Sequence, residues 1–339
     1  MQKQKKIIVI GATSFSGSNL INLALHKKYH VTGVSRSKEP NNIFLPYKWE
    51  NNNKLCNADK YKYIYRTINL NNDINKLIEL IDEVRPEFII NFAAQGMVAE
   101  SWLNPTDWYQ TNVVSQVAFH DLLRKRKFLE KYVHITTPEV YGSTNSWIKE
   151  NNNFSPSTPY AVSRASCDLH LLSFFKAYDF PVVFTRAANV YGAGQQLYRI
   201  IPRTILSALT KKKMYLHGGG ESIRSFIHIN DVANATLKIA EKADPGTTWH
   251  ISTKETISIR ELVYKIFRKL NVDPSGIVIE NNERLGKDQS YLLDSSSLRE
   301  NMAWEEKISL NEGISETINW VENNIEIMKE LPWEYIHKR

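Results

Sequence analysis

The fold is decided by the stretch Ile7-Ile8-Val9-Ile10-Gly11-Ala12-Thr13-Ser14-Phe15-Ser16-Gly17. Its first four apolar residues predict a buried strand, and Gly17–Lys27 predicts a helix. Gly11 permits a tight turn, and Gly17 lets the helix pack close to the strand. A serine stands where a middle glycine is usual, and such glycines can also serve packing alone. Because the helix N-terminus offers amide donors to a pyrophosphate, the stretch predicts a dinucleotide site made by Gly11, Thr13, Ser14, Phe15, Ser16 and Gly17.

Apolar runs alternate with amphipathic runs through the first half of the chain. This rhythm predicts strands at Ile7–Ile10, His30–Val34, within Tyr61–Leu70, and at Phe88–Ala93, Tyr132–Ile135 and Pro181–Thr185. It predicts helices at Gly17–Lys27, Asn72–Val84, Trp108–Arg126 and Ala161–Tyr178. Continuously apolar strands that alternate with helices are typical of a doubly wound parallel sheet, so the expected fold class is α/β of the Rossmann type.

The rhythm loosens after about Arg186. Further helices are predicted at Ile200–Thr210, Val232–Ala243, Ile259–Leu270 and Leu310–Glu330. The pattern predicts a smaller, mixed α/β region that binds the substrate and is woven into the sheet domain. We expect residues 1–185, with a return segment near 225–255, to form the dinucleotide-binding domain, and residues 186–224 and 256–339 to form the substrate-binding region.

Composition and charge argue against several classes of protein. The 339 residues are 42% hydrophobic and 23% charged, which is typical of a soluble globular protein, and no apolar run approaches the roughly 18 residues that span a bilayer. The net charge of +7 comes from scattered basic residues, which favours an anionic substrate over nucleic acid. The short runs Arg124–Lys127 and Lys211–Lys213 are expected near helix C-termini, where cations complement the dipole.

The cysteines and the N-terminal segment predict the compartment. Cys56 and Cys167 lie far apart and match no metal spacing, which predicts free thiols and no metal site. The first apolar stretch is too short for the core of a signal peptide. We therefore expect a cytoplasmic protein.

The end of the second predicted strand bears on the choice of cofactor. It has the sequence Val34-Ser35-Arg36-Ser37, and no acidic residue occurs before Glu39. An aspartate or glutamate here would hold the ribose 2′-hydroxyl of NAD, whereas an arginine accommodates the 2′-phosphate of NADP. The sequence therefore favours NADP, with Arg36 as the contact. The alternative is that Arg36 is only a solvated loop residue.

A hydroxyl, a carboxylate, a phenol and a cation follow the fifth predicted strand. Tyr160 and Arg164 are four positions apart on one predicted helix and so share a face. We expect the cation to lower the pKa of Tyr160, so that its phenolate accepts a hydroxyl proton while hydride leaves the same carbon. Thr137 is expected to hydrogen-bond that hydroxyl, and Glu139 to act as a base on a neighbouring carbon. The alternative is a core tyrosine and a helix-capping threonine.

Several long motifs, in order along nearly the whole chain, carry a family resemblance. They are Asn91-Phe92-Ala93-Ala94-Gln95, Thr137-Pro138-Glu139-Val140-Tyr141-Gly142, Ser157-Thr158-Pro159-Tyr160-Ala161-Val162-Ser163-Arg164-Ala165-Ser166, Arg186-Ala187-Ala188-Asn189-Val190-Tyr191-Gly192, Gly218-Gly219-Gly220-Glu221-Ser222-Ile223-Arg224-Ser225-Phe226-Ile227-His228 and Arg284-Leu285-Gly286-Lys287-Asp288-Gln289-Ser290-Tyr291. With them the chain resembles the extended short-chain dehydrogenase/reductases, most closely the nucleoside-diphosphate-sugar 4,6-dehydratases.

The resemblance implies the partners and the remaining site residues. The cofactor would be NADP or NAD, tightly bound and recycled, and the substrate a nucleotide sugar. The implied cofactor contacts also include Asn69, Leu70, Ala93, Ala94, Gln95, Thr111, Tyr160 and Arg164. The implied substrate contacts are Ser101, Thr137, Glu139, Asn189, Arg203, Arg224 and Arg284. A homodimer would form through a four-helix bundle of Trp108–Arg126 and Ala161–Tyr178, where the apolar Leu171, Leu172, Phe174 and Phe175 fit either the interface or the core.

The resemblance also implies a three-stage reaction. Tyr160 would take the 4-hydroxyl proton as the C4 hydride passes to the cofactor. Glu139 would remove the C5 proton, water would leave from C6, and hydride would return to C6. The product would be a 4-keto-6-deoxy sugar nucleotide.

Three departures from the family pattern keep other functions open. Pro138 replaces the aspartate that would protonate the leaving hydroxyl, although GDP-mannose-type dehydratases resemble this chain in lacking it. Arg164 replaces the usual lysine, and the two cations are not interchangeable. Met97, Ala99 and Glu100 stand where other polar residues are frequent. The alternatives are a sugar-nucleotide epimerase or C4 dehydrogenase on the same scaffold, and a non-catalytic NAD(P)-binding protein.

Overall fold

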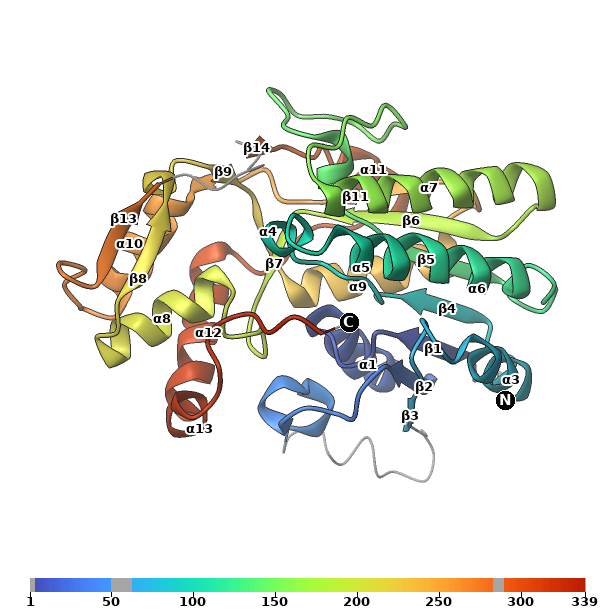
Figure 1. Cartoon of the computed structure of the whole chain (residues 1–339), viewed down its shortest axis with the longest axis horizontal. Helices are drawn as coiled ribbons and strands as arrows, with labels where there is room; N and C mark the ends of the chain where they lie inside the picture. Colours follow the sequence, from blue (N-terminus) through green and yellow to red (C-terminus); the bar gives the residue numbers. More distant parts are fainter. Residues whose placement is uncertain (1–3, 50–62, 283–289, 339) are drawn as a thin grey trace.

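A seven-stranded, fully parallel sheet organises the computed structural model, which describes residues 4–49, 63–282 and 290–338 (Figure 1). The strand order is β11-β6-β5-β4-β1-β2-β3. These strands are β1 (Lys6–Ile10), β2 (His30–Ser35), β3 (Tyr63–Thr67), β4 (Phe88–Asn91), β5 (Lys131–Ile135), β6 (Val182–Ala187) and β11 (Thr248–Ile251). The strand order reverses beside β1, which is where a doubly wound sheet opens a ligand crevice. The predicted fold class is confirmed.

Helices cover both faces of the sheet because its strands are apolar on both sides. Helices α1 (Phe15–His26) and α9 (Ile229–Lys242) pack against Ile7 and Val9 on one face. Helices α3 (Ile74–Val84), α6 (Ser115–Leu123) and α7 (Pro159–Tyr178) pack against Ile8 and Ile10 on the other. Alternate residues of one strand thus supply two separate cores.

A smaller lobe lies beside one end of the sheet, on the left of Figure 1. Its helices are α8 (Ile200–Thr210), α10 (Ile259–Lys269), α12 (Leu310–Asn323) and α13 (Ile325–Lys329). Its small sheets pair β8 (Met214–His217) with β13 (Val278–Asn281), and β12 (Ile257–Ser258) with β9 (Ile223–Arg224) and β14 (Ser290–Tyr291). The connecting elements are β7 (Asn189–Tyr191), β10 (Phe226–His228) and α11 (Ser296–Met302). Glycine turns and short strands here explain why the sequence rhythm loosens.

The predicted helix at Trp108–Arg126 differs most from the structure. It begins earlier, as α5 (Pro105–Tyr109), passes through a π-helical segment (Gln110–Val114) and continues as α6. A short helix, α4 (Val98–Ser101), precedes it. The predicted helix Leu310–Glu330 is also divided, at Asn324 between α12 and α13. Widened turns of this kind recur at functional sites, and this one lies beside the carboxyl end of β4.

Some of the predicted residues lie outside the described part of the chain, and the structure shows how deeply several others are buried. Cys56 and Arg284 lie outside the described part of the chain. Cys167 is buried and free, as expected. Leu171 is fully buried in the core, and Leu172, Phe174 and Phe175 are partly buried and pack against that same core. None of the helices in the described ranges is long and apolar enough to cross a membrane.

Candidate active site

The predicted dinucleotide turn lies between β1 and α1. Gly11 has φ +82°, a conformation that a side chain would strain, and a Cβ there would meet Phe92 and Ala93 at 2.9 Å. A Cβ on Gly17 would meet the Gly11 carbonyl oxygen at 2.3 Å. Ser14 caps α1 because its Oγ accepts from the Gly17 amide at 3.1 Å. Both glycines therefore leave room for a backbone turn at the helix N-terminus, and this geometry fits a dinucleotide diphosphate.

Replacing Gly17 with alanine tests this turn. Because the added methyl group cannot occupy space 2.3 Å from the Gly11 oxygen, the turn must move away from β1. We expect NADH and NADPH to bind at least about tenfold more weakly, since the diphosphate amides lose their alignment. Fluorescence titration of the reduced dinucleotides measures the change. Unchanged affinity for both would contradict a diphosphate site at this turn.

The other residues predicted to contact the cofactor follow the ends of β2, β3 and β4, on the same edge of the sheet. Ser35 Oγ accepts from the Thr13 amide at 3.0 Å and fixes the glycine turn to the end of β2. Leu70 is buried, and Asn69 begins the turn into α3. Thr111 lies in the π-helical segment, where its hydroxyl accepts from Asn71 at 3.0 Å. The structure thus brings together the strand-end positions that the resemblance implied.

Asn112 connects the loop after β4 to α7 at this edge of the sheet, and no sequence motif indicated this role. Its side chain accepts from the Gln95 amide at 2.8 Å and donates to the Gln95 carbonyl at 3.0 Å. It also donates to Ser163 on α7 at 2.9 Å. The sequence shows only an asparagine within a predicted helix, and the structure shows that this residue is fully buried and therefore needs partners. Asn112 ties the loop after β4 to the helix that carries Tyr160.

The candidate catalytic residues gather at the carboxyl end of β5. Thr137 follows the strand and caps a short 3₁₀ helix, Pro138–Tyr141, that carries Glu139. Tyr160 is the second residue of α7, whose N-cap is Thr158. Thr137 hydrogen-bonds Tyr160, and the charge of Glu139 acts on the Tyr160 phenol. Hydroxyl, carboxylate and phenol therefore lie together, as the sequence predicted.

The predicted lowering of the Tyr160 pKa is wrong in this structure. Burial raises the pKa of Tyr160, and the negative charge of Glu139 raises it further. Arg164 and the Thr137 hydrogen bond lower it, but they do not offset the first two effects. The guanidinium is turned toward the strand, where it donates to the carbonyl of Ile135 and lies 3.3 Å from His134 Nε2. The four-residue spacing on α7 indicated that Arg164 shares a helix face with Tyr160, but it did not indicate where the guanidinium points.

Arg164 stands at one end of a buried polar network. It is 2% exposed, and its Nη1 lacks a hydrogen-bond partner among the described residues. His134 Nε2 also lies 3.3 Å from Asp168, which pairs with Arg186 at 2.9 Å. Burial alone would raise the pKa of Asp168, but its hydrogen bond with His134 and the charge of Arg186 outweigh it and hold that pKa below its usual value. Arg186, which begins one of the motifs that carry the family resemblance, is a fully buried core residue of β6.

Two buried histidines, His134 of this network and His250 on β11, predict acid sensitivity. Burial lowers the pKa of His134 to about 4 and that of His250 to about 3, from 6.5. Their contribution to stability is complete above pH 6.5 and is lost as pH falls toward those folded values, because the unfolded chain binds the protons. We expect the unfolding free energy to fall by on the order of a few kcal/mol between pH 7 and 4. Denaturant unfolding at several pH values measures the slope, and His250→Gln should flatten it. A slope of zero across this range would contradict neutral buried histidines.

The predicted substrate residues lie on several separate elements of the structure. Asn189 lies on β7. Ser101 is buried, and its hydroxyl donates a hydrogen bond to the Val98 carbonyl. Arg224 is largely buried, with its guanidinium 4.5 Å from the centre of the Tyr291 ring. Arg203 donates to the Trp333 carbonyl at 3.0 Å and pairs with Glu334 at 2.9 Å. The C-terminal segment therefore already engages Arg203, which the sequence assigned to substrate.

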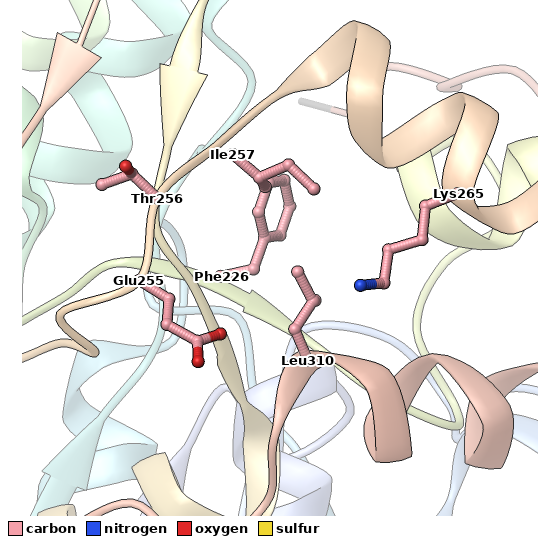
Figure 2. A pocket seen from close by; sticks show the side chains of 6 residues that line it. All are labelled: Phe226, Glu255, Thr256, Ile257, Lys265 and Leu310. Atoms are coloured by element: carbon pink, nitrogen blue, oxygen red, sulfur yellow. The ribbon is translucent and has the colours of Figure 1, made fainter.

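The smaller lobe contains a cavity of about 260 Å³ (Figure 2). Phe226, Ile257 and Leu310 point toward one another in it, and Lys265 reaches in from α10. These apolar side chains belong to the core of the lobe. The lining contains none of the candidate catalytic residues, so we assign it no catalytic role. Across the described ranges, no group of three or more His, Cys, Asp or Glu residues is arranged to hold a metal ion.

Comparison with known proteins agrees with this geometry. The GDP-mannose 4,6-dehydratase family model matches residues 8–317. A dTDP-glucose 4,6-dehydratase of Escherichia coli is 28% identical over 95% of this chain and 94% of its own length. A trifunctional UDP-glucose 4,6-dehydratase, epimerase and reductase of Arabidopsis thaliana is 26% identical over 95% of this chain, which spans only 48% of that protein. The chain thus spans about half the length of such plant relatives.

A solved structure shows the same fold. The dTDP-glucose 4,6-dehydratase of Streptomyces venezuelae, determined with NAD bound, has a TM-score of 0.85 to this chain. It is 24% identical in sequence, and the alignment covers 95% of this chain and 98% of that one. At this identity the likeness shows the fold alone.

Proposed function

The chain belongs to the GDP-mannose 4,6-dehydratase family, and we propose that it is a nucleoside-diphosphate-sugar 4,6-dehydratase. The product is a 4-keto-6-deoxy sugar nucleotide. One observation carries this proposal, namely the placing of Thr137, Glu139 and Tyr160 together at the carboxyl end of β5. The neighbouring β1–α1 turn fits NAD(P) on the geometry of Gly11 and Gly17.

Each catalytic side chain has a separate task. Tyr160 accepts the proton of the sugar 4-hydroxyl, and Thr137 holds that hydroxyl by a hydrogen bond. When bound, NAD(P) supplies the hydride acceptor for C4 and the hydride donor for C6. The 4-ketone makes the C5 proton acidic, and Glu139 removes it as water leaves from C6. Arg164, whose Nη1 has no hydrogen-bond partner within the described part of the chain, stabilises the phenolate of Tyr160 by its charge.

The residue at position 138 cannot supply the proton for the leaving C6 hydroxyl, so another group must. Pro138 is buried and opens the 3₁₀ helix, and proline has no proton to give. Glu139 is protonated once it has taken the C5 proton, so the same carboxyl group can donate to the C6 hydroxyl. A water molecule at this place is the alternative donor.

We propose that the preferred dinucleotide is NADP, because Arg36 directly follows β2, where a cation can bind the 2′-phosphate. Arg36→Ala should weaken NADPH binding by more than about tenfold, the value of one charge-assisted contact, and change NADH binding little. Because Arg36 also contacts the Lys338 carbonyl, any effect through that contact applies to both dinucleotides. The ratio of the two affinities, measured by fluorescence titration, therefore isolates the 2′-phosphate. An equal loss for both would remove Arg36 from cofactor selection.

We propose a homodimer that pairs the layer of α5, α6 and α7 with its copy. Six large apolar or aromatic side chains of this layer and its flanking loop are exposed, namely Trp102, Leu103, Tyr109, Val114, Leu169 and Tyr178. Figure 1 shows these helices side by side on one face of the sheet. Sedimentation equilibrium measures the mass of the assembly.

The test of the function is a change in mass. Incubation with dTDP-glucose, UDP-glucose or GDP-mannose should give a product lighter by one water. The rival function is an epimerase or C4 dehydrogenase, which Pro138 favours because it supplies no acid. Isomerisation without a change in mass would support that rival and overturn the dehydratase proposal for that substrate.

A further inference from the structure

The C-terminal tail runs from the smaller lobe to the dinucleotide crevice. It follows α13, passes the buried Trp333 and runs toward α1 in Figure 1. There the Lys338 carbonyl accepts from Arg36 Nη1 at 3.0 Å and from Gln95 Nε2 at 2.6 Å. One peptide carbonyl thus joins the residue after β2 to a residue after β4.

Two further anchors hold the tail along its length. The His337 ring stacks on Trp108 of α5, with centroids 5.1 Å apart and planes 12° apart, and its Nε2 lies 2.8 Å from Asp107. Trp108 is fully buried, so this contact has a rigid base. At the other end, Arg203 holds the Trp333 carbonyl and the Glu334 carboxylate.

The positions of these anchors define what the tail crosses. Strands β2 and β4 flank β1 on its two sides, so Arg36 and Gln95 stand on the two walls of the crevice above the Gly11–Gly17 turn. A dinucleotide in a sheet of this topology lies in that crevice. The tail therefore passes over the place where the dinucleotide binds. The cationic Lys338 suits the negative charge of a dinucleotide.

We propose that Glu334–Lys338 is a strap that closes over the bound dinucleotide and slows its release. This inference rests on the proposed function, because a reaction that returns its hydride to the sugar has no need to exchange the cofactor between turnovers. Retention then costs nothing in turnover and prevents loss of the cofactor while the keto sugar is present. Gln95 and His337 are the anchors that hold the strap closed.

The experiment compares release rates of NADH and NADPH from three variants and the intact chain, without any sugar. The variants are a chain ending at Glu334, His337→Ala and the neighbouring control Ile336→Ala, whose side chain is 60% exposed. Stopped-flow displacement measures the dissociation rate. We expect the truncated chain to release the dinucleotide at least about tenfold faster, His337→Ala to be faster by a smaller factor, and Ile336→Ala to match the intact chain. Hydrogen exchange at 335–338 should slow when the dinucleotide is bound.

Two results would overturn the strap. Equal release rates in the truncated and intact chains would show that the tail does not retain the cofactor. Tighter binding after truncation would show that the tail occupies the place of the dinucleotide instead of covering it. Thermal unfolding of each variant separates a folding defect from a release effect. The release experiment uses no sugar, so its result does not depend on dehydratase activity. If the tail slowed cofactor release but the chain removed no water from any sugar nucleotide, only the proposed function would be overturned.

Discussion

Replacing Glu139 with glutamine is expected to stop water loss while oxidation at C4 continues. The glutamine amide keeps the size of the side chain but cannot take the C5 proton, and general bases of this kind contribute roughly 10² to 10⁴ in rate. The dehydrated product should therefore fall by that factor. Reduced cofactor and a 4-keto sugar of unchanged carbon skeleton should accumulate, as measured by nicotinamide absorbance and mass spectrometry in a single turnover.

The same variant should shift the pH dependence of C4 oxidation. The negative charge of Glu139 raises the pKa of Tyr160, so removing that charge lowers it. Oxidation requires the phenolate, and its rate should therefore reach its plateau at lower pH in Glu139→Gln than in the parent chain. Glu255→Gln, a change in a side chain outside the catalytic cluster, is the matched control. Unchanged turnover in Glu139→Gln would remove Glu139 from the mechanism.

Replacing Tyr160 with phenylalanine is expected to abolish both oxidation and dehydration. The ring still fills its place at the start of α7, but no oxygen remains to take the 4-hydroxyl proton. We expect kcat to fall by about 10² to 10⁴, with a smaller effect on substrate binding, because the lost interaction acts in the transition state. Unlike Glu139→Gln, this variant should produce no reduced cofactor in a single turnover.

A tyrosine far from the site provides the control for that loss. Tyr215 on β8 is more than half exposed, so Tyr215→Phe removes one phenolic oxygen without touching the candidate site. Full activity in this control, with equal thermal stability of both variants, assigns the effect to Tyr160. If Tyr160→Phe retained the oxidation rate of the parent chain, another group would be the base.

The fold was predictable because its signals are local and repeated. The buried run Ile7–Ile10 and the glycine turn after it predict β1, the turn and α1, and helix Ile200–Thr210 has the bounds expected from its periodicity. The helix at Trp108–Arg126 was not predicted correctly. Its periodic apolar residues give no indication that Asn112 hydrogen-bonds the loop after β4. That tertiary contact lies within the π-helical turn, which interrupts the regular helix.

The candidate site was predictable as a set of residues but not in its electrostatics. Helix spacing correctly placed Arg164 on the face of Tyr160, yet the guanidinium turns to the Ile135 carbonyl. A side chain with several rotatable bonds follows its tertiary partners, and these lie on another strand. The tail could not be foreseen for a similar reason, because Arg36 and Lys338 are 302 positions apart.

Isotope transfer from C4 to C6 tests the central claim most directly. A nucleotide-linked glucose carrying deuterium at C4 is incubated with the chain and its cofactor, and the product is examined by mass spectrometry and NMR. We expect a product lighter by one water, with the deuterium at C6. Deuterium found at C4 of a sugar of unchanged mass would contradict it.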